Sequence, residues 1–150
     1  MPADPGGDHL DLVELERHLT GFIRAFGLLA GDVTPCGEPI PVSEAHAVTE
    51  LANAGPMTQR ELGDRLQLTK GTVSRIVRLL VERGWVRQRP AERAGVELRL
   101  TTAGRAAAKR IAGRRRDKLT AMLQAVPAPE RQRVIDALAL LAKAAHEPSP

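Results

Sequence analysis

The sequence predicts a mainly α-helical protein that carries one small β-hairpin near its middle. Over most of the chain, apolar residues recur at intervals of three and four, which is the periodicity of amphipathic helices. Between residues 85 and 100 the interval changes to two, which is typical of strands. With 150 residues, 43% of them apolar, the chain can bury one sizeable core or two small lobes that share one.

The first predicted helix covers about residues 8–29. Its apolar positions form a heptad-like stripe: Leu12, Leu15, Leu19, Phe22, Phe26 and Leu29. Three prolines and two glycines in GDVTPCGEPIP (31–41) interrupt this pattern. We then expect Ser43 to cap a second helix that runs to about Asn53.

Two short helices with a tight turn between them follow, which is a helix-turn-helix arrangement. Thr58 and Glu61 have the spacing of a capping box, in which each side chain accepts the other residue's amide hydrogen. After the turn, Thr69 caps the second helix, which ends near Arg83. Gly84 stands where helices commonly end in a left-handed residue.

Two strands are predicted next. Residues 85–89 form the first, and in the second the apolar Val96, Leu98 and Leu100 alternate with charged residues. The loop between them begins with Pro90, which cannot donate a hydrogen bond to a strand ladder. A helix-turn-helix followed by a β-hairpin is a winged helix.

Two further helices complete the chain. Thr101 or Thr102 caps a long helix that extends to about Val126, and Pro129 suits the first turn of the last helix. Apolar residues of that last helix again have three-and-four spacing: Val134, Leu138, Leu141 and Ala145. The stripes at the two chain ends lie on helices too few to bury one another, so they indicate a partner.

The helix after Thr69 has two different faces. Within one arc of roughly 100° lie four apolar residues, which predict a core-facing side: Val73, Ile76, Val77 and Leu80. The other side carries Gly71, Arg75, Arg78 and Glu82, with Ser74 on the flank and Thr69 and Lys70 at the N-terminus. Small residues let the backbone approach closely, arginine pairs with guanine or phosphate, and first-turn amides bind phosphate. The pattern predicts a recognition helix for the DNA major groove. An ordinary helix with a basic solvent face is the alternative, which the hairpin disfavours.

Charge is distributed unevenly along this basic chain, whose net charge is +4 and whose pI is about 10.0. Residues 1–50 carry nine acidic and two basic groups, a net of −7. Residues 51–104 carry a net of +5 and residues 105–118 a net of +6. Positive charge concentrated from mid-chain onward indicates a polyanionic partner, although solvated arginine faces produce the same count.

Residues 56–105 resemble the MarR family of bacterial transcriptional regulators. The runs TQRELGDRLQLTKGTVSRIVRLLVERGWVRQRP and VELRLTTAGR carry the resemblance, with Thr-Val-Ser-Arg, Leu-x-x-x-Gly-Trp-Val and Leu-Thr-x-x-Gly as its parts. The flanking helices match in number and length. The resemblance implies an obligate homodimer whose first, fifth and sixth helices intertwine and hold two winged helices against a pseudo-palindromic double-stranded DNA operator. Its recognition helices would lie about one DNA turn apart, ~34 Å.

We expect the chain to be divided into three segments with different roles. Residues 1–41 form an N-terminal tail and dimerisation helix, residues 42–104 the winged helix-turn-helix DNA-binding domain, and residues 105–150 a long linker helix and C-terminal dimerisation helix. The expected dimer interface consists of Leu12, Leu19, Phe22, Phe26, Val134, Leu138 and Leu141. The expected DNA-binding residues are Thr69, Lys70, Gly71, Thr72, Ser74, Arg75, Arg78, Arg87, Arg89 and Arg93.

The wing departs from the family pattern. The family usually has Asp-x-Arg, in which the acid orients an arginine that enters the minor groove. This chain has Glu92-Arg93-Ala94 instead. We therefore expect Arg93 to take that role, supported by Arg87 and Arg89.

Other candidate sites have simpler interpretations. Cys36 has no Lys, Arg or His near it in sequence to stabilise a thiolate, so an incidental cysteine is favoured over an oxidant sensor. A zinc site needs three or four ligands, and the long helix after the wing has no histidine to join His46, so no metal or cofactor is expected. The run Arg114–Arg116 is expected to be solvated or at an interface edge, with DNA phosphates as the alternative.

Catalytic, secreted and membrane proteins are disfavoured. The sequence has no Gly-rich phosphate loop and no Cys-His or Ser-His pair in a recognisable context, so it is not expected to be an enzyme. It shows no signal peptide, and no apolar run approaches the ~20 residues that span a bilayer. Since Cys36 is the only cysteine, no intrachain disulfide forms, and we expect a cytoplasmic protein.

The sequence thus predicts a sequence-specific DNA-binding transcriptional regulator, a homodimeric repressor that a small-molecule effector releases. The resemblance places the effector pocket between the dimer helices and the winged helix, near Phe22, Phe26 and His46. Two alternatives stay open: a nonspecific architectural DNA binder, and a protein-interaction module on a winged-helix dimer scaffold.

Overall fold

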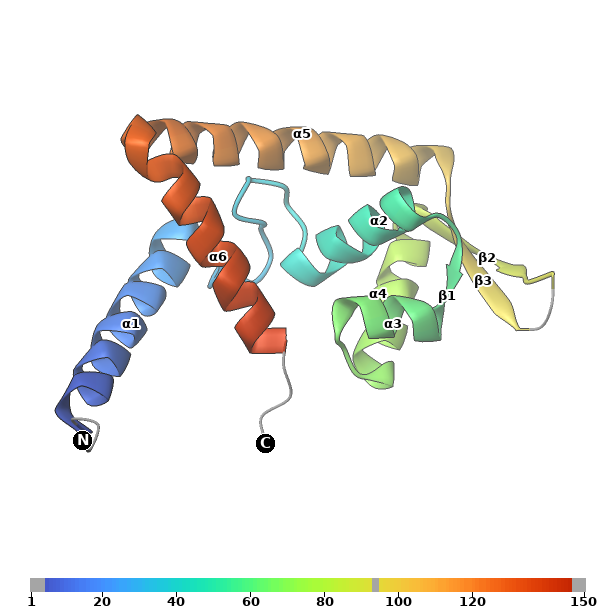
Figure 1. Cartoon of the computed structure of the whole chain (residues 1–150). Helices are drawn as coiled ribbons and strands as arrows, with labels where there is room; N and C mark the ends of the chain where they lie inside the picture. The colour runs from blue at the N-terminus through green and yellow to red at the C-terminus, as the bar shows by residue number, and fades with distance from the viewer. Residues whose placement is uncertain (1–4, 93–94, 147–150) are drawn as a thin grey trace. The chain divides into compact units, whose positions relative to one another are not determined.

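Helices make up most of the chain, with one small sheet (Figure 1). This computed structural model describes residues 5–92 and 95–146, and the chain divides into two compact units, Met1–Arg114 and Arg115–Pro150. The predicted mainly helical winged-helix fold is confirmed. In chain order the elements are α1 (Pro5–Phe26), α2 (Val42–Ala54), β1 (Met57–Thr58), α3 (Gln59–Leu66), α4 (Lys70–Glu82), β2 (Val86–Pro90), β3 (Val96–Leu100), α5 (Thr102–Ala125), the 3-10 turn η1 (Ala128–Glu130) and α6 (Arg131–His146).

The sheet has three antiparallel strands in the order β1-β3-β2. The hairpin of β2 and β3 is the predicted one, with Val86 opposite Leu100. Strand β1 was not predicted, because two residues are too few to show an alternating pattern. It pairs Met57 with Leu98 and so attaches the start of α3 to the hairpin.

One hydrophobic core joins the helices and strands of the first unit. It contains residues from α2, α3, α4, the sheet and the N-terminal half of α5. The side chains that are almost fully buried include Val48, Leu62, Ile76, Leu80, Leu98 and Ile111. Burying each such side chain contributes roughly 1.5–3 kcal/mol to folding.

Three predicted helix ends were wrong, the first being the start of α1, which begins at Pro5 and not near residue 8. Helix α1 ends at Phe26, three residues early, because Gly27 adopts a left-handed conformation (φ 94°) and the amides of Gly27 and Leu28 both donate to the Ile23 carbonyl. Ser43 does not cap α2: this helix begins one residue before it, at Val42, after Pro41, and no side chain caps it.

A hydrogen-bonded junction joins the end of α4, both hairpin strands and the start of α5. Gly84 is left-handed as predicted (φ 75°). The Trp85 amide still donates to Leu80 of α4, so β2 begins one residue later than predicted. Across the junction Thr101 donates its amide to Trp85 (2.9 Å) and its hydroxyl to Gly84 (2.6 Å). The same hydroxyl accepts the Gly104 amide at 3.0 Å, so Thr101 caps α5.

Two buried carboxylates form ion pairs with arginines far away in sequence. Glu38, in the segment before α2, pairs with Arg110 (3.0 Å) and Arg114 (3.2 Å) of α5. Glu44 of α2 pairs with Arg83 at the end of α4 (2.8 Å). Glu38 and Glu44 are almost fully buried, so removing their partners would leave costly unpaired charges.

Trp85 lies under two of these arginines. The guanidinium carbon of Arg83 lies 5.5 Å from the indole centroid and that of Arg110 lies 5.9 Å from it, within cation–π range. The end of α4 is therefore tied to α2 by an ion pair and to α5 through the indole.

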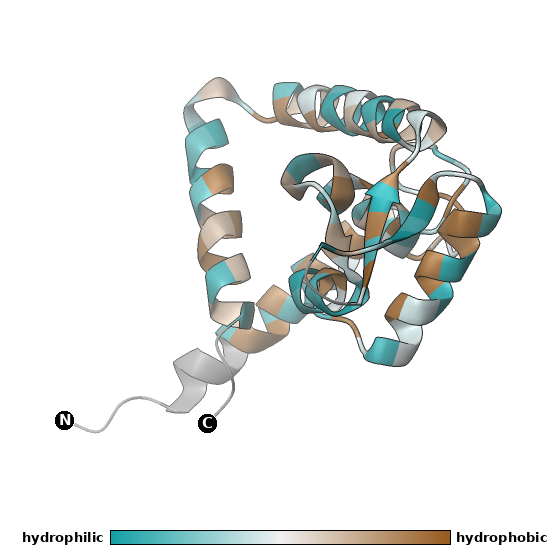
Figure 2. Ribbon diagram, turned by 90° about the vertical axis from the view of Figure 1, so that its right-hand side faces the viewer, coloured by the Kyte–Doolittle hydropathy of each residue, from teal (hydrophilic) through white to brown (hydrophobic). Residues whose placement is uncertain are grey.

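The second unit consists of the end of α5, η1 and α6. Arg131 closes its turn by donating to the carbonyls of Val126 (3.0 Å) and Gln124 (3.3 Å). Apolar and hydrophilic positions alternate along α6 (Figure 2). No residue of this helix is buried in the chain, and Leu138, Leu140 and Leu141 are all exposed.

Among the described residues, no helix is long and apolar enough to span a membrane.

We predict that Gly104→Ala destabilises the first unit, because a Cβ at this position would overlap the Trp85 carbonyl and lie 3.1 Å from Leu100 Cδ2. Overpacking of this kind costs about 1–3 kcal/mol. Gly113→Ala, in the same helix with nothing within 4 Å of its Cβ, should gain about 0.5–1 kcal/mol. Urea denaturation followed by circular dichroism measures both, and equal stabilities would refute the close approach.

Candidate nucleic-acid interface

Helices α3 and α4 meet at a tight turn. Gln67 takes the left-handed conformation there (φ 55°), and the Leu68 amide donates to the Gly63 carbonyl at 3.1 Å. Gly63 is buried, and a Cβ on it would lie 3.2 Å from Val73 Cγ2. The absent side chain lets the two helices pack closely.

The predicted capping box at the start of α3 is confirmed. The Thr58 amide donates to Glu61 Oε2 at 2.7 Å, and the Glu61 amide donates to the Thr58 hydroxyl at 3.2 Å. The same hydroxyl donates to the carboxylate at 3.0 Å. These hydrogen bonds from Thr58 hold the pKa of the Glu61 carboxyl below its ordinary value.

Helix α4 has the predicted buried face. Its four buried residues are Val73, Ile76, Val77 and Leu80. They pack in the core of the first unit and thereby direct Ser74, Arg75 and Arg78 to solvent. Neither Arg75 nor Arg78 forms a hydrogen bond or an ion pair with any described residue. Their charges are therefore available to an external anion.

The start of α4 is open as well. Thr69 caps the helix as predicted, its hydroxyl accepting the Thr72 amide at 3.4 Å and lying 3.0 Å from the Thr72 hydroxyl. Lys70 and Gly71 are exposed, and a Cβ on Gly71 would meet nothing within 4 Å. Packing within this chain therefore does not require a glycine here, whereas close approach of another molecule would.

The two faces of the wing hairpin differ. Gln88 lies on the face of the buried Val86 and helps line a hollow of about 230 Å³ that also includes Ser74 and Arg78 of α4. Arg87 and Arg89 lie on the opposite face, across from Arg99 and Glu97. Both arginines are exposed. Arg93, assigned to the wing tip, lies outside the described residues.

Several arginines of the basic segments form ion pairs within the chain, so their charges are neutralised. Arg83, Arg99 and Arg110 form ion pairs with carboxylates. Arg114, expected to be solvated or at an interface edge, also donates to the Gly37 carbonyl at 2.9 Å. The buried partners, Glu38 and Glu44, were not predicted, since nothing in the neighbouring sequence distinguishes them from surface acids.

The residues predicted for dimerisation are exposed apolar side chains for the most part. Leu12, Leu19 and Phe22 are 59%, 50% and 40% exposed, and in the second unit Leu138 and Leu141 are 50% and 45% exposed. Phe26 and Val134 are half-buried.

Of the residues suggested for an effector pocket, Phe22 and Phe26 stack with ring centroids 5.2 Å apart, and His46 is exposed on α2. The Cys36 thiol lies 3.0 Å from the Thr34 hydroxyl. Within the described residues, no three His, Cys, Asp or Glu side chains group as metal ligands would.

Solved structures with this fold span nearly the whole chain. PcaV, a transcriptional regulator from Streptomyces coelicolor, is 24% identical with a TM-score of 0.68, covering 97% of this chain and 100% of its own. A MarR family protein from Bacillus stearothermophilus is 20% identical with a TM-score of 0.71, at the same coverage. The regulator NMB1585 from Neisseria meningitidis is 21% identical with a TM-score of 0.64, covering 89% of this chain and 92% of its own. A comparison with curated protein sequences gives no match.

The fold defines a winged helix-turn-helix protein. Residues 39–95, from the segment before α2 to the wing, match the sequence model of the MarR family. Over these residues the chain is similar to the MarR family, and NMB1585, which shares the fold, is a MarR family regulator.

We predict that Thr58→Ala raises the Glu61 pKa toward its ordinary value, because the mutation removes the hydroxyl hydrogen bond and leaves only the amide. Since the folded pKa is depressed, the capping box stabilises the fold above the ordinary carboxyl range and loses this effect as pH falls through the folded pKa. Carboxyl NMR titration of both proteins measures the shift. An unchanged Glu61 pKa in the folded variant would contradict the assigned cause.

Proposed function

We propose that the chain is a sequence-specific transcriptional repressor that binds a pseudo-palindromic DNA operator as a homodimer. The observation that carries this proposal is the outward face of α4, where Arg75 and Arg78 are exposed without intramolecular partners. The open N-terminus of the same helix supports phosphate contacts through Lys70 and the first-turn amides.

The homodimer is supported by apolar surface in both units. A single chain leaves Leu12, Leu19, Leu138 and Leu141 at least 45% exposed. Burying such side chains between two copies gives a large apolar interface of the obligate kind. In the dimer, two α4 helices about one DNA turn apart, ~34 Å, would contact successive major grooves.

Release by a small molecule is the regulatory part of the proposal. PcaV was crystallised with its natural ligand, which supports a ligand-responsive mode for a protein of this fold. We assign the effector pocket to the region of Phe22, Phe26 and His46. The effector would favour a spacing of the two winged helices that the operator disfavours, so the two ligands would weaken each other's binding.

Selection of bound DNA from a random pool tests the function as a whole. Enrichment of a pseudo-palindrome, with a large ratio of operator to random-DNA affinity at stated salt, is expected. A ratio near one with strong binding would indicate an architectural DNA binder, and no DNA binding would indicate a protein-interaction scaffold.

We predict that Arg75→Ala weakens operator binding by roughly 1–3 kcal/mol and relaxes the base preference at one position, as loss of a base-edge contact does. Arg24→Ala is the matched control, since Arg24 is exposed on α1 and is not among the expected DNA contacts. Titrations of operator and single-base variants measure both effects. Wild-type affinity and specificity in folded Arg75→Ala would remove this side chain from the interface.

We predict that Leu138→Asp prevents assembly, because an Asp at a buried interface introduces an uncompensated charge. The variant should unfold or aggregate, and operator binding should be lost with it. Leu140→Asp is the matched control: Leu140 is 69% exposed and lies about 200° around α6 from Leu138. Sedimentation and circular dichroism decide, and a well-folded monomer, either wild type or Leu138→Asp, would refute the obligate dimer.

A further inference from the structure

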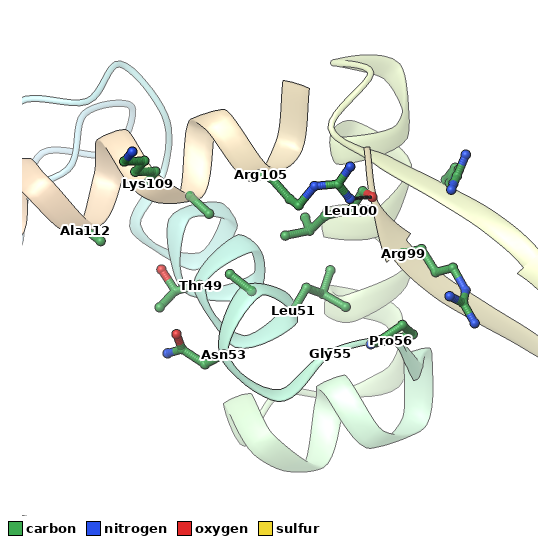
Figure 3. Close-up of a pocket in the computed structure, with 13 residues that line it drawn as sticks. Thr49, Leu51, Asn53, Gly55, Pro56, Arg99, Leu100, Arg105, Lys109 and Ala112 are labelled. Atoms are coloured by element: carbon green, nitrogen blue, oxygen red, sulfur yellow. Dashed lines mark hydrogen bonds between the residues drawn. The ribbon is translucent and has the colours of Figure 1, made fainter. Parts of the chain in front are cut away.

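A pocket of about 530 Å³ lies inside the first unit, between α2, the outer face of the wing hairpin and the N-terminal half of α5 (Figure 3). Its volume is in the range of small-molecule sites. The pocket does not include Phe22, Phe26 or His46, and it faces away from the hollow that Gln88 shares with α4.

Cationic side chains from three elements line this pocket. Arg87 comes from β2, Arg99 from β3, and Arg105 and Lys109 from α5. Its lining contains no carboxylate. Clustering like charges around one hollow is unfavourable unless an anion or solvent compensates them.

Only one of the four cations is neutralised within the described chain. Arg99 pairs with Glu97 at 2.8 Å. Arg105 donates to the uncharged Leu100 carbonyl (3.0 Å) and the Thr102 hydroxyl (3.3 Å), which hold the guanidinium in place without cancelling its charge. Arg87 and Lys109 form no hydrogen bond or ion pair with described residues. Three positive charges are therefore uncompensated.

The remaining surface of the pocket is mostly small and apolar. Pro56, Ala108 and Ala112 contribute to it, and Thr49 and Asn53 add two polar groups on the α2 side (Figure 3). Guanidinium groups match the geometry of carboxylate and phosphate oxygens. An apolar wall opposite such groups suits the hydrocarbon part of a ligand.

We propose that this pocket binds a small organic anion that carries two negative charges on an apolar body, such as a dicarboxylate or a phosphate monoester. Two charges match the three uncompensated cations better than one. DNA backbone is the disfavoured occupant, because a phosphate chain would leave the concave apolar wall unfilled. Arg87 is the one lining residue that is also a proposed operator contact, and the other lining residues lie outside both the operator contacts and the effector region assigned above.

Calorimetry with four ring compounds of similar size tests the charge requirement. Phthalate and phenyl phosphate are dianions near pH 7.5, benzoate is a monoanion and benzamide is neutral. At least one dianion should bind more tightly than benzoate, and benzamide should bind weakest. The two dianions also separate a carboxylate preference from a phosphate preference. Affinities independent of charge would refute the proposal.

Variants of α5 test the location. Ala112 is exposed within the pocket lining, so Ala112→Glu adds a carboxylate there, while Ala112→Gln adds the same bulk without charge. The Glu variant should weaken dianion binding by roughly two- to fivefold relative to the Gln variant, the scale of a partly exposed ion pair. Lys109→Gln should weaken it similarly, and Arg116→Gln should not. Equal binding by both Ala112 variants would place the ligand elsewhere.

Measuring operator binding by a pocket variant tests whether the pocket is distinct from the DNA interface. Lys109→Gln, folded as judged by circular dichroism, should bind operator with wild-type affinity and salt dependence in the absence of dianion. A lower affinity together with a flatter salt slope would assign Lys109 to DNA phosphates and overturn the small-anion site. The anion titrations need no DNA, so they test the pocket even if the proposed repressor function is wrong.

Discussion

The arrangement of the first unit depends on the junction where α4, the two hairpin strands and α5 meet. Thr101 hydrogen-bonds to Gly84, Trp85 and Gly104, and Gly104 is so close to the Trp85 carbonyl that a side chain has no room. All of these groups except the Thr101 hydroxyl are backbone, and two hydrogen bonds hold that hydroxyl, so displacing one element would break several contacts at once. The exit of α4, the wing and the start of α5 therefore form one rigid body.

Buried ion pairs extend this rigid body to α2 and the preceding segment. Arg83 at the end of α4 pairs with Glu44 and lies on Trp85, and Arg110 pairs with Glu38 and lies on the same indole. A displacement of α2 or of the segment before it would separate a buried carboxylate from its arginine, which is strongly unfavourable. Movement near His46 or Phe26 would therefore be transmitted to the orientation of α4.

The features that sequence predicted correctly are local ones. Thr58, Thr69 and Gly84 act within four residues along the chain, and the apolar face of α4 repeats within one helix, so a short window contains the whole signal. The buried acids depend on partners far away: Arg83 is 39 residues from Glu44, and Arg110 is 72 residues from Glu38. Strand β1 likewise exists only because β3 pairs with it. The number of arginines in the sequence therefore does not show which of them pair with buried acids and which have no intramolecular partner.

The two faces of the wing hairpin have different neighbours. Gln88 faces α4, whereas Arg87 and Arg99 face the cationic pocket, because successive residues of a strand point to opposite sides. Arg87 is a proposed DNA contact and also lines the pocket. A dianion held there would neutralise charge that otherwise attracts phosphates, so anion and operator would oppose each other through this guanidinium. Linkage makes the effect reciprocal: the factor by which the anion lowers operator affinity equals the factor by which the operator lowers anion affinity. The pocket would in this way couple to DNA binding through electrostatics alone, without displacing the rigid junction.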